Sequence, residues 1–131
     1  MIRCHDTYLA VLPTSITTNR NIVNNSDDRL KSQTVDLTNA LDLINQVRVR
    51  EYQYHPTHRV PEGVEDSDLT GIEHSKAVGV VAQEIRTIPE LAWLVHEADD
   101  TLSVDYTSLN VYLLRAVQQL TRQVTELQAR V

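Results

Sequence analysis

The chain has 131 residues, of which 41% are hydrophobic and 23% charged, the size and composition of one folded domain rather than a disordered chain. Its single cysteine excludes a disulfide framework and a cysteine-based zinc site, and no apolar stretch approaches the length of a membrane span. The net charge of −6 argues against a nucleic-acid-binding module. Because the chain has one Trp, no Phe and three Gly, we expect a core of Leu, Val, Ile and Ala, which favours helices.

The negative charge is concentrated in one segment. Five acidic residues and no Lys or Arg lie between Pro61 and Ser75, so the rest of the chain is nearly neutral. A connection this long with little apolar content is expected to be a mobile loop or insertion, here an acidic loop over residues 61–76. His55 and His58 have the spacing of metal ligands, but no cysteine lies near them. We therefore expect loop histidines and no metal site.

Residues 1–25 are predicted to be extended. The apolar run Tyr8–Leu12 ends at Pro13, and Ser15–Thr18 is β-branched with alternating polarity, both typical of strands. No helical periodicity occurs in this part of the chain.

Helical periodicity begins after Thr34. The apolar residues that fall on one helical face are Leu37, Ala40, Leu41, Ile44 and Val47. Either Thr34 or Asp36 is placed to cap the start of this helix. Alternation between Val49 and Tyr54 then predicts a strand.

After the acidic segment, short strands and helices are predicted to alternate. Residues Ala77–Ala82 read as a short buried strand, and Pro89 opens a short helix that runs to Val95. A turn is expected at Asp99–Asp100, followed by a strand over residues 102–104. Trp93 is expected to anchor the core rather than to bind a ligand.

The last predicted element, and the clearest one, is a helix over residues 106–131 with Asp105 as its cap. Its apolar residues recur at intervals of four and three: Leu113, Val117, Leu120, Val124, Leu127 and Val131. This spacing is the a/d seam of a coiled coil, and its flanks carry few charges. The alternative is a single amphipathic helix packed on its own domain. Under three heptads do not associate stably alone, so the globular part is expected to assist.

A serine and a lysine five residues apart, Ser26 and Lys31, are the candidate catalytic pair. A serine hydroxyl becomes a good nucleophile when a base removes its proton, and lysine can act as that base when desolvation or nearby cations keep it neutral. One turn of backbone would bring the two side chains together. The structural alternative is that Ser26 caps a helical turn, with Asp27 and Asp28 near its positive end.

Four motifs resemble, in their order, the C-terminal intramolecular chaperone domain of phage tail spikes and tail fibres. The motifs are Ser26-Asp-Asp-Arg-Leu-Lys31, Gly79-Val-Val-Ala-Gln-Glu84, Pro89-Glu90, and Val104-Asp105-Tyr106 leading through Leu109 into the heptad helix. This is the self-cleaving domain of endosialidases, the peptidase S74 family, also found in myelin regulatory factors. The resemblance covers residues 24–131, apart from the acidic loop.

The resemblance implies an α+β fold, with a small mixed head of short strands and helices and a long C-terminal helix forming a trimeric coiled-coil stalk. Residues 1–25 would be the end of an upstream fibre, and residues 26–131 the chaperone. The implied partners are two further copies in a homotrimer and the upstream fibre of the same polypeptide, with no nucleic acid and no membrane. The implied setting is a virion tail fibre or spike precursor assembled in the host cytoplasm.

The resemblance also implies a function. The domain would drive homotrimerisation and then release itself by a single-turnover cut at the Asn25–Ser26 bond. Ser26 would be the nucleophile and Lys31 the base, with Asp27 and Arg29 as candidate supporting residues and no cofactor. The alternative is a non-cleaving trimerisation or structural cap in which Ser26 is inert. A Ser/Lys hydrolase acting on other substrates is disfavoured, because no substrate-pocket motif accompanies the pair.

Overall fold

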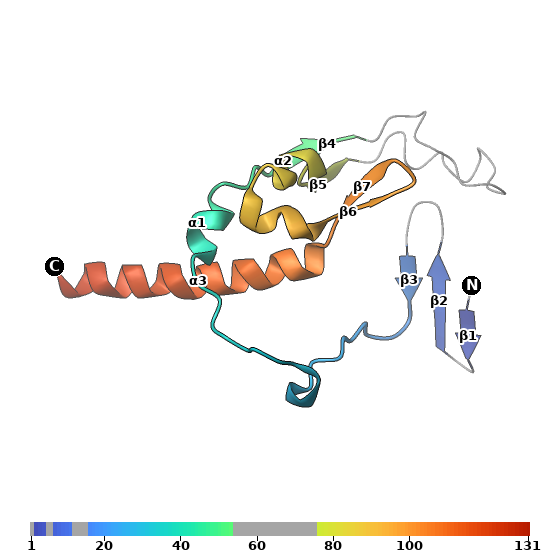
Figure 1. Ribbon diagram of the computed structural model, residues 1–131, viewed down its shortest axis with the longest axis horizontal. Helices are drawn as coiled ribbons and strands as arrows, with labels where there is room; N and C mark the ends of the chain where they lie inside the picture. Colours follow the sequence, from blue (N-terminus) through green and yellow to red (C-terminus); the bar gives the residue numbers. More distant parts are fainter. Residues whose placement is uncertain (1, 5–6, 12–15, 54–75) are drawn as a thin grey trace. The chain divides into compact units, whose positions relative to one another are not determined.

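The computed structural model describes residues 2–4, 7–11, 16–53 and 76–131 (Figure 1). The chain divides into two compact units, one comprising Met1–Thr34 and Glu51–Ala77 and the other Val35–Arg50 and Val78–Val131. Short strands and short helices occur together with one long C-terminal helix, which confirms the predicted α+β class. No helix in the described part of the chain is long and apolar enough to cross a membrane.

The first unit contains a three-stranded antiparallel sheet in the order β1-β2-β3 (Figure 1). The strands are β1 (Ile2–Cys4), β2 (Thr7–Val11) and β3 (Ile16–Thr18). Leu9 at the centre of β2 lies opposite Ile2 on one side and Thr18 on the other. The prediction of strands in this part of the chain is confirmed, and a single 3₁₀ turn, η1 (Asp28–Leu30), follows them.

In the second unit, the first helix is shorter than predicted. Helix α1 (Ala40–Ile44) has five residues, and neither Thr34 nor Asp36 caps it. Its N-cap is Asn39, which has a φ of 65° and makes no side-chain cap hydrogen bond. This left-handed residue prevents the helix from starting earlier, so the predicted stripe over residues 37–47 is interrupted. Ala40 of that stripe is buried and Val47 packs against the core, and Leu43, which lies outside the stripe, enters the core as well.

The remaining short elements follow the prediction in part. The strand predicted over Ala77–Ala82 ends at Gly79 and is not buried, since Val78 is 69% exposed, and the helix Ala82–Arg86 and the strand Val95–Ala98 were not predicted. Strands β4 (Arg50–Tyr52) and β5 (Ala77–Gly79) pair, α2 (Ala82–Arg86) follows, and η3 (Pro89–Leu94) is a 3₁₀ helix. Strands β6 (Val95–Ala98) and β7 (Thr101–Val104) form a hairpin. Its turn residues Asp99 and Asp100 have φ values of 52° and 61°. Positive φ at both central residues matches the right-handed strand twist, and Asp tolerates it.

A small aliphatic core holds the second unit together. It consists of Leu43, Ile85, Ile88, Leu91 and Leu94, with Leu109 and Tyr112 of the last helix packed against it. The prediction that Trp93 anchors this core is wrong, because its side chain is 55% exposed. In η3 the inward positions recur every third residue and belong to Leu91 and Leu94, which leaves Trp93 on an outer face.

Helix α3 (Tyr106–Ala129) is the long C-terminal helix. Asp105 caps it as predicted, accepting hydrogen bonds from the Ser108 N–H at 3.0 Å and the Ser108 hydroxyl at 2.7 Å. These bonds, the backbone one first, lower the pKa of Asp105 because they favour its ionised form.

Two separate faces of α3 are apolar. The face turned toward its own unit carries Leu109, Tyr112 and the buried Ala116. The heptad seam lies on another face: Leu113, Val117, Leu120, Val124 and Leu127 are each between 45% and 59% exposed. The helix packs on its own unit, but it does so without using the seam. The seam is therefore uncovered in the single chain.

Candidate active site

The turn η1 brings Ser26 and Lys31 together. Two backbone hydrogen bonds of 3.0 Å close it, from Leu30 N–H to the Asp27 carbonyl and from Lys31 N–H to the Asp28 carbonyl. With the backbone turned in this way, the Lys31 Nζ donates a hydrogen bond to the Ser26 Oγ at 2.8 Å. The five-residue spacing therefore places an amine directly on a serine hydroxyl, the contact that base activation of serine requires.

Asp27 and Arg29 hold this turn closed. The Asp27 Oδ1 accepts the Arg29 backbone N–H at 2.9 Å and so caps η1, a role that the structural alternative gave to Ser26. The Arg29 guanidinium also donates hydrogen bonds to this carboxylate. Its Nε lies 3.0 Å from Oδ1, and a terminal nitrogen lies 2.7 Å from Oδ2. The Arg29 side chain, and then its backbone N–H, lower the pKa of Asp27. Because Asp27 supplies the cap, the Ser26 hydroxyl is left for Lys31.

The residues around the pair are exposed and extended. Ser26 and Lys31 are exposed, and so is Asn25, whose carbonyl forms the predicted scissile bond. Apolar residues before the pair and between its two members are also largely uncovered, with Val23 at 84% and Leu30 at 70% exposure. The carbonyl carbon of Asn25 is bonded to the Ser26 nitrogen, so attack by the Ser26 Oγ closes a five-membered ring. The described residues of the site thus place a hydroxyl, an amine and an adjacent carbonyl together on exposed chain.

We expect Asp27→Ala to slow cleavage at the Asn25–Ser26 bond about fivefold, the factor that corresponds to loss of one helix cap. The reason is that the turn loses both its cap and its Arg29 clamp. Intact-mass spectrometry over a time course measures the rate. Asp28→Ala is the matched control, since that neighbouring carboxylate lies on the same turn and does not cap it. Equal rates in the two variants would remove the positioning role of Asp27.

A second charged cluster surrounds Glu84, the last residue of the Gly79–Glu84 motif. Arg50 binds its carboxylate through two hydrogen bonds, Nε to Oε1 at 3.0 Å and a terminal nitrogen to Oε2 at 2.7 Å, and Arg48 approaches at 3.5 Å. The bond from Arg50 is the main reason why the pKa of Glu84 is lowered. The cluster ties α2 to the first residue of β4 and to the segment before it, a structural role that the sequence did not reveal.

Glu84→Gln is expected to destabilise the second unit at neutral pH and to be nearly neutral in strong acid. The pKa of Glu84 is lowered by folding, so its contribution is present above the ordinary carboxyl pKa of ~4.3 and is lost as the pH falls through the lower folded value. Thermal melts of both proteins between neutral and acidic pH measure the difference. Glu90→Gln in η3 is the control. If the melting temperatures of the wild type and Glu84→Gln differ by the same amount at every pH, the ion-pair role of Glu84 is contradicted.

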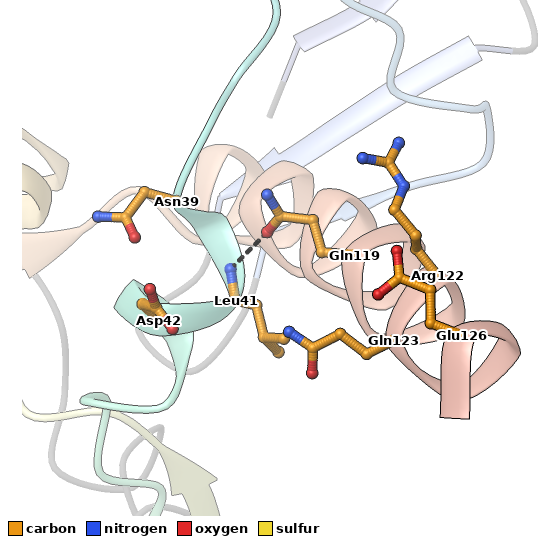
Figure 2. Close-up of a pocket in the computed structure, with 7 residues that line it drawn as sticks. All are labelled: Asn39, Leu41, Asp42, Gln119, Arg122, Gln123 and Glu126. Atoms are coloured by element: carbon orange, nitrogen blue, oxygen red, sulfur yellow. Dashed lines mark hydrogen bonds between the residues drawn. The ribbon is translucent and has the colours of Figure 1, made fainter. Parts of the chain in front are cut away.

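A polar pocket of about 290 Å³ lies between α1 and α3 (Figure 2). Its lining residues are Asn39, Leu41, Asp42, Gln119, Arg122, Gln123 and Glu126. Gln119 accepts the Leu41 N–H at 2.8 Å and so supplies the cap that Asn39 does not give to α1 (Figure 2). The lining contains no serine, lysine, cysteine or histidine, so this pocket offers no second serine–lysine pair.

Some predicted features lie outside the described residues. These are the histidines His55 and His58 and nearly all of the acidic loop over residues 61–76. Within the ranges that the structure describes, no group of His, Cys, Asp and Glu side chains is arranged to hold a metal ion.

Comparison with known families decides the identity of the domain. The family described as chaperone of endosialidase, peptidase S74, matches residues 26–95, more than half of the chain. The chain belongs to this family. As a member of the chaperone-of-endosialidase family it carries an intramolecular chaperone domain, and the match begins at Ser26 and includes the Gly79–Glu84 motif. Among curated proteins, no relative matches the chain.

Proposed function

We propose that this chain is the intramolecular chaperone of a viral tail fibre or spike, which brings three copies together and then releases itself by cutting the Asn25–Ser26 bond. The observation that carries the proposal is the 2.8 Å hydrogen bond between the Lys31 Nζ and the Ser26 Oγ. It occurs in a member of the peptidase S74 family, at the residue where the family match begins. Residues 1–25 would then remain with the upstream fibre.

The proposed chemistry is an acyl shift followed by hydrolysis. Lys31 accepts the Ser26 hydroxyl proton while the Oγ attacks the Asn25 carbonyl carbon. The carbon–nitrogen bond breaks, the Ser26 nitrogen takes up a proton as a free amine, and an ester joins Asn25 to the Ser26 Oγ. Water then cleaves the ester to give the Asn25 carboxylate and the serine hydroxyl. Since nucleophile and carbonyl belong to consecutive residues, proximity replaces a substrate-binding cleft.

Arg29 also supports this chemistry by binding both carboxylate oxygens of Asp27. A free carboxylate beside Lys31 would pair with its ammonium and favour the charged form, which cannot act as a base. In the structure both oxygens of Asp27 are bound by Arg29. The cluster therefore keeps the turn closed without an ion pair between Asp27 and the base.

The uncovered seam of α3 supports the proposed assembly. Its five apolar side chains from Leu113 to Leu127 repeat with heptad spacing, so the seam is complementary to copies of itself. Packing of the three seams around one axis would bury them, and each globular head would lie beside the start of the stalk.

Mass measurements test the proposal as a whole. Under denaturing conditions the purified chain should give two species, residues 1–25 and residues 26–131, and under native conditions the larger species should have the mass of three copies. If the full-length species persists and is trimeric, the proposed cleavage is wrong and the chain is a non-cleaving structural cap. A native mass of one chain at micromolar concentration would contradict both.

A further inference from the structure

Helix α3 carries a second uncovered apolar strip beside the seam. Val111 and Leu114 are 56% and 61% exposed, comparable to the residues of the seam, which are 45% to 59% exposed. They lie at the start of the stalk, next to the globular head, and on the side of the helix away from Tyr112, which packs on the core. Nothing in the seam or in the head of the same unit covers them.

The seam needs such an additional contact. With Leu113, Leu120 and Leu127 at d positions, Asn110, Val117 and Val124 take the a positions. Val at a with Leu at d favours two strands in parallel coiled coils, so the seam does not by itself select three chains. None of the flanking e and g positions of the helix proper is charged, so they give no ion pairs that would fix the partner. The e positions are Thr107, Leu114, Thr121 and Gln128, and the g positions are Leu109, Ala116 and Gln123.

Heptad geometry shows what faces the strip. In a parallel coiled coil, the e side of one helix lies against the g side of its neighbour. Leu114 is at e and Val111 at b on the same flank, while the opposite flank carries Leu109 at g and Tyr112 at c. Trp93 lies on Tyr112: its Nε1 donates to the Tyr112 hydroxyl at 3.1 Å, with ring centroids 6.4 Å apart. That flank is thus a half-exposed aromatic surface formed by the head.

We propose that Val111 and Leu114 of each chain pack against the Trp93–Tyr112 pair of the next copy, as a second interface beside the seam. The inference rests on the proposed parallel assembly and names its second interface. In a parallel assembly the contact joins two different surfaces and repeats from each chain to the next around the axis. It also explains why the only tryptophan of the chain is left outside the core.

Heptad-matched substitutions test the contact. Leu114→Glu is expected to raise the concentration for half-assembly at least tenfold, because it places a charge against Trp93. Thr121→Glu, at the same e position one heptad farther along and about 10 Å from Leu114, should leave the trimer intact. Analytical ultracentrifugation of the full chain measures both. Trp93 is the only tryptophan, so its emission should shift to the blue on assembly in the wild type and in Thr121→Glu, but not in Leu114→Glu.

A double variant tests the pairing itself. Leu114→Glu combined with Trp93→Arg should restore the trimer, since every contact then joins the carboxylate of one chain to the guanidinium of the next. Within one chain the two sites lie on different sides of α3, so an internal rescue is excluded. If Leu114→Glu and Thr121→Glu assemble like a trimeric wild type, this second interface is wrong and the proposed function stands. A monomeric wild type would overturn the proposed function as well.

Discussion

Lys31→Met should suppress cleavage at the Asn25–Ser26 bond by about 10² to 10⁴-fold, the contribution expected of a positioned general base. Methionine keeps the length and most of the volume of the lysine side chain but cannot accept the proton of the Ser26 hydroxyl. The hydrogen bond of 2.8 Å between the Lys31 Nζ and the Ser26 Oγ is lost, and the turn itself remains, because its cap and clamp come from Asp27 and Arg29. Intact-mass spectrometry of the purified protein over several days gives the rate.

The chain provides a matched control for each member of the pair. Lys76 is its only other lysine, and it forms an exposed ion pair with Glu51 at 2.7 Å, so Lys76→Met should cleave like the wild type. Ser26→Ala should be inactive, whereas Ser32→Ala, one residue beyond the base, should be active. If Lys31→Met cleaves at the rate of the wild type while Ser26→Ala does not, another group is the base and the dyad is wrong.

Local features of this chain could be predicted from its sequence, and features that depend on distant residues could not. The approach of Lys31 to Ser26 needs only one turn of backbone, so the five-residue spacing allows it, and the family resemblance favoured it over the capping alternative. The cap of α3 at Asp105 is local in the same way. The binding of Glu84 by Arg50 joins residues 34 apart, and only the folded head brings them together.

Each error in the predicted fold has an identifiable physical cause. Periodicity predicted a helix over residues 37–47, but the left-handed conformation of Asn39 starts it later. Gln119 then supplies the missing cap from a position 78 residues away, which no local pattern reveals. Trp93 was expected inside because it is large and apolar, but the 3₁₀ repeat gives the inward positions to its neighbours. Its exposed position becomes informative only when a second copy is considered.

Leu120→Asp is expected to dissociate the assembly into single chains while the globular head remains folded. Leu120 lies in the middle of the seam and is 49% exposed, so in one chain the aspartate has access to water. In a trimer three such carboxylates would meet at the axis, where the effective cost of burial is several kcal/mol per ion without a partner. Association should therefore weaken by more than about 10³-fold, which light scattering at micromolar concentration detects as a change from three chains to one.

A control substitution outside the seam, on the same helix, tests whether the effect of Leu120→Asp is specific to the seam. Thr125→Asp introduces the same charge on α3 at a b position, outside the seam, and should leave the trimer unchanged. The core of the head contains neither residue, so the unfolding of the head should have a similar midpoint in both variants. A trimer that survives Leu120→Asp would show that the seam is not the assembly axis. The three chains would then be held by the head alone, and α3 would extend from the assembly as three separate helices.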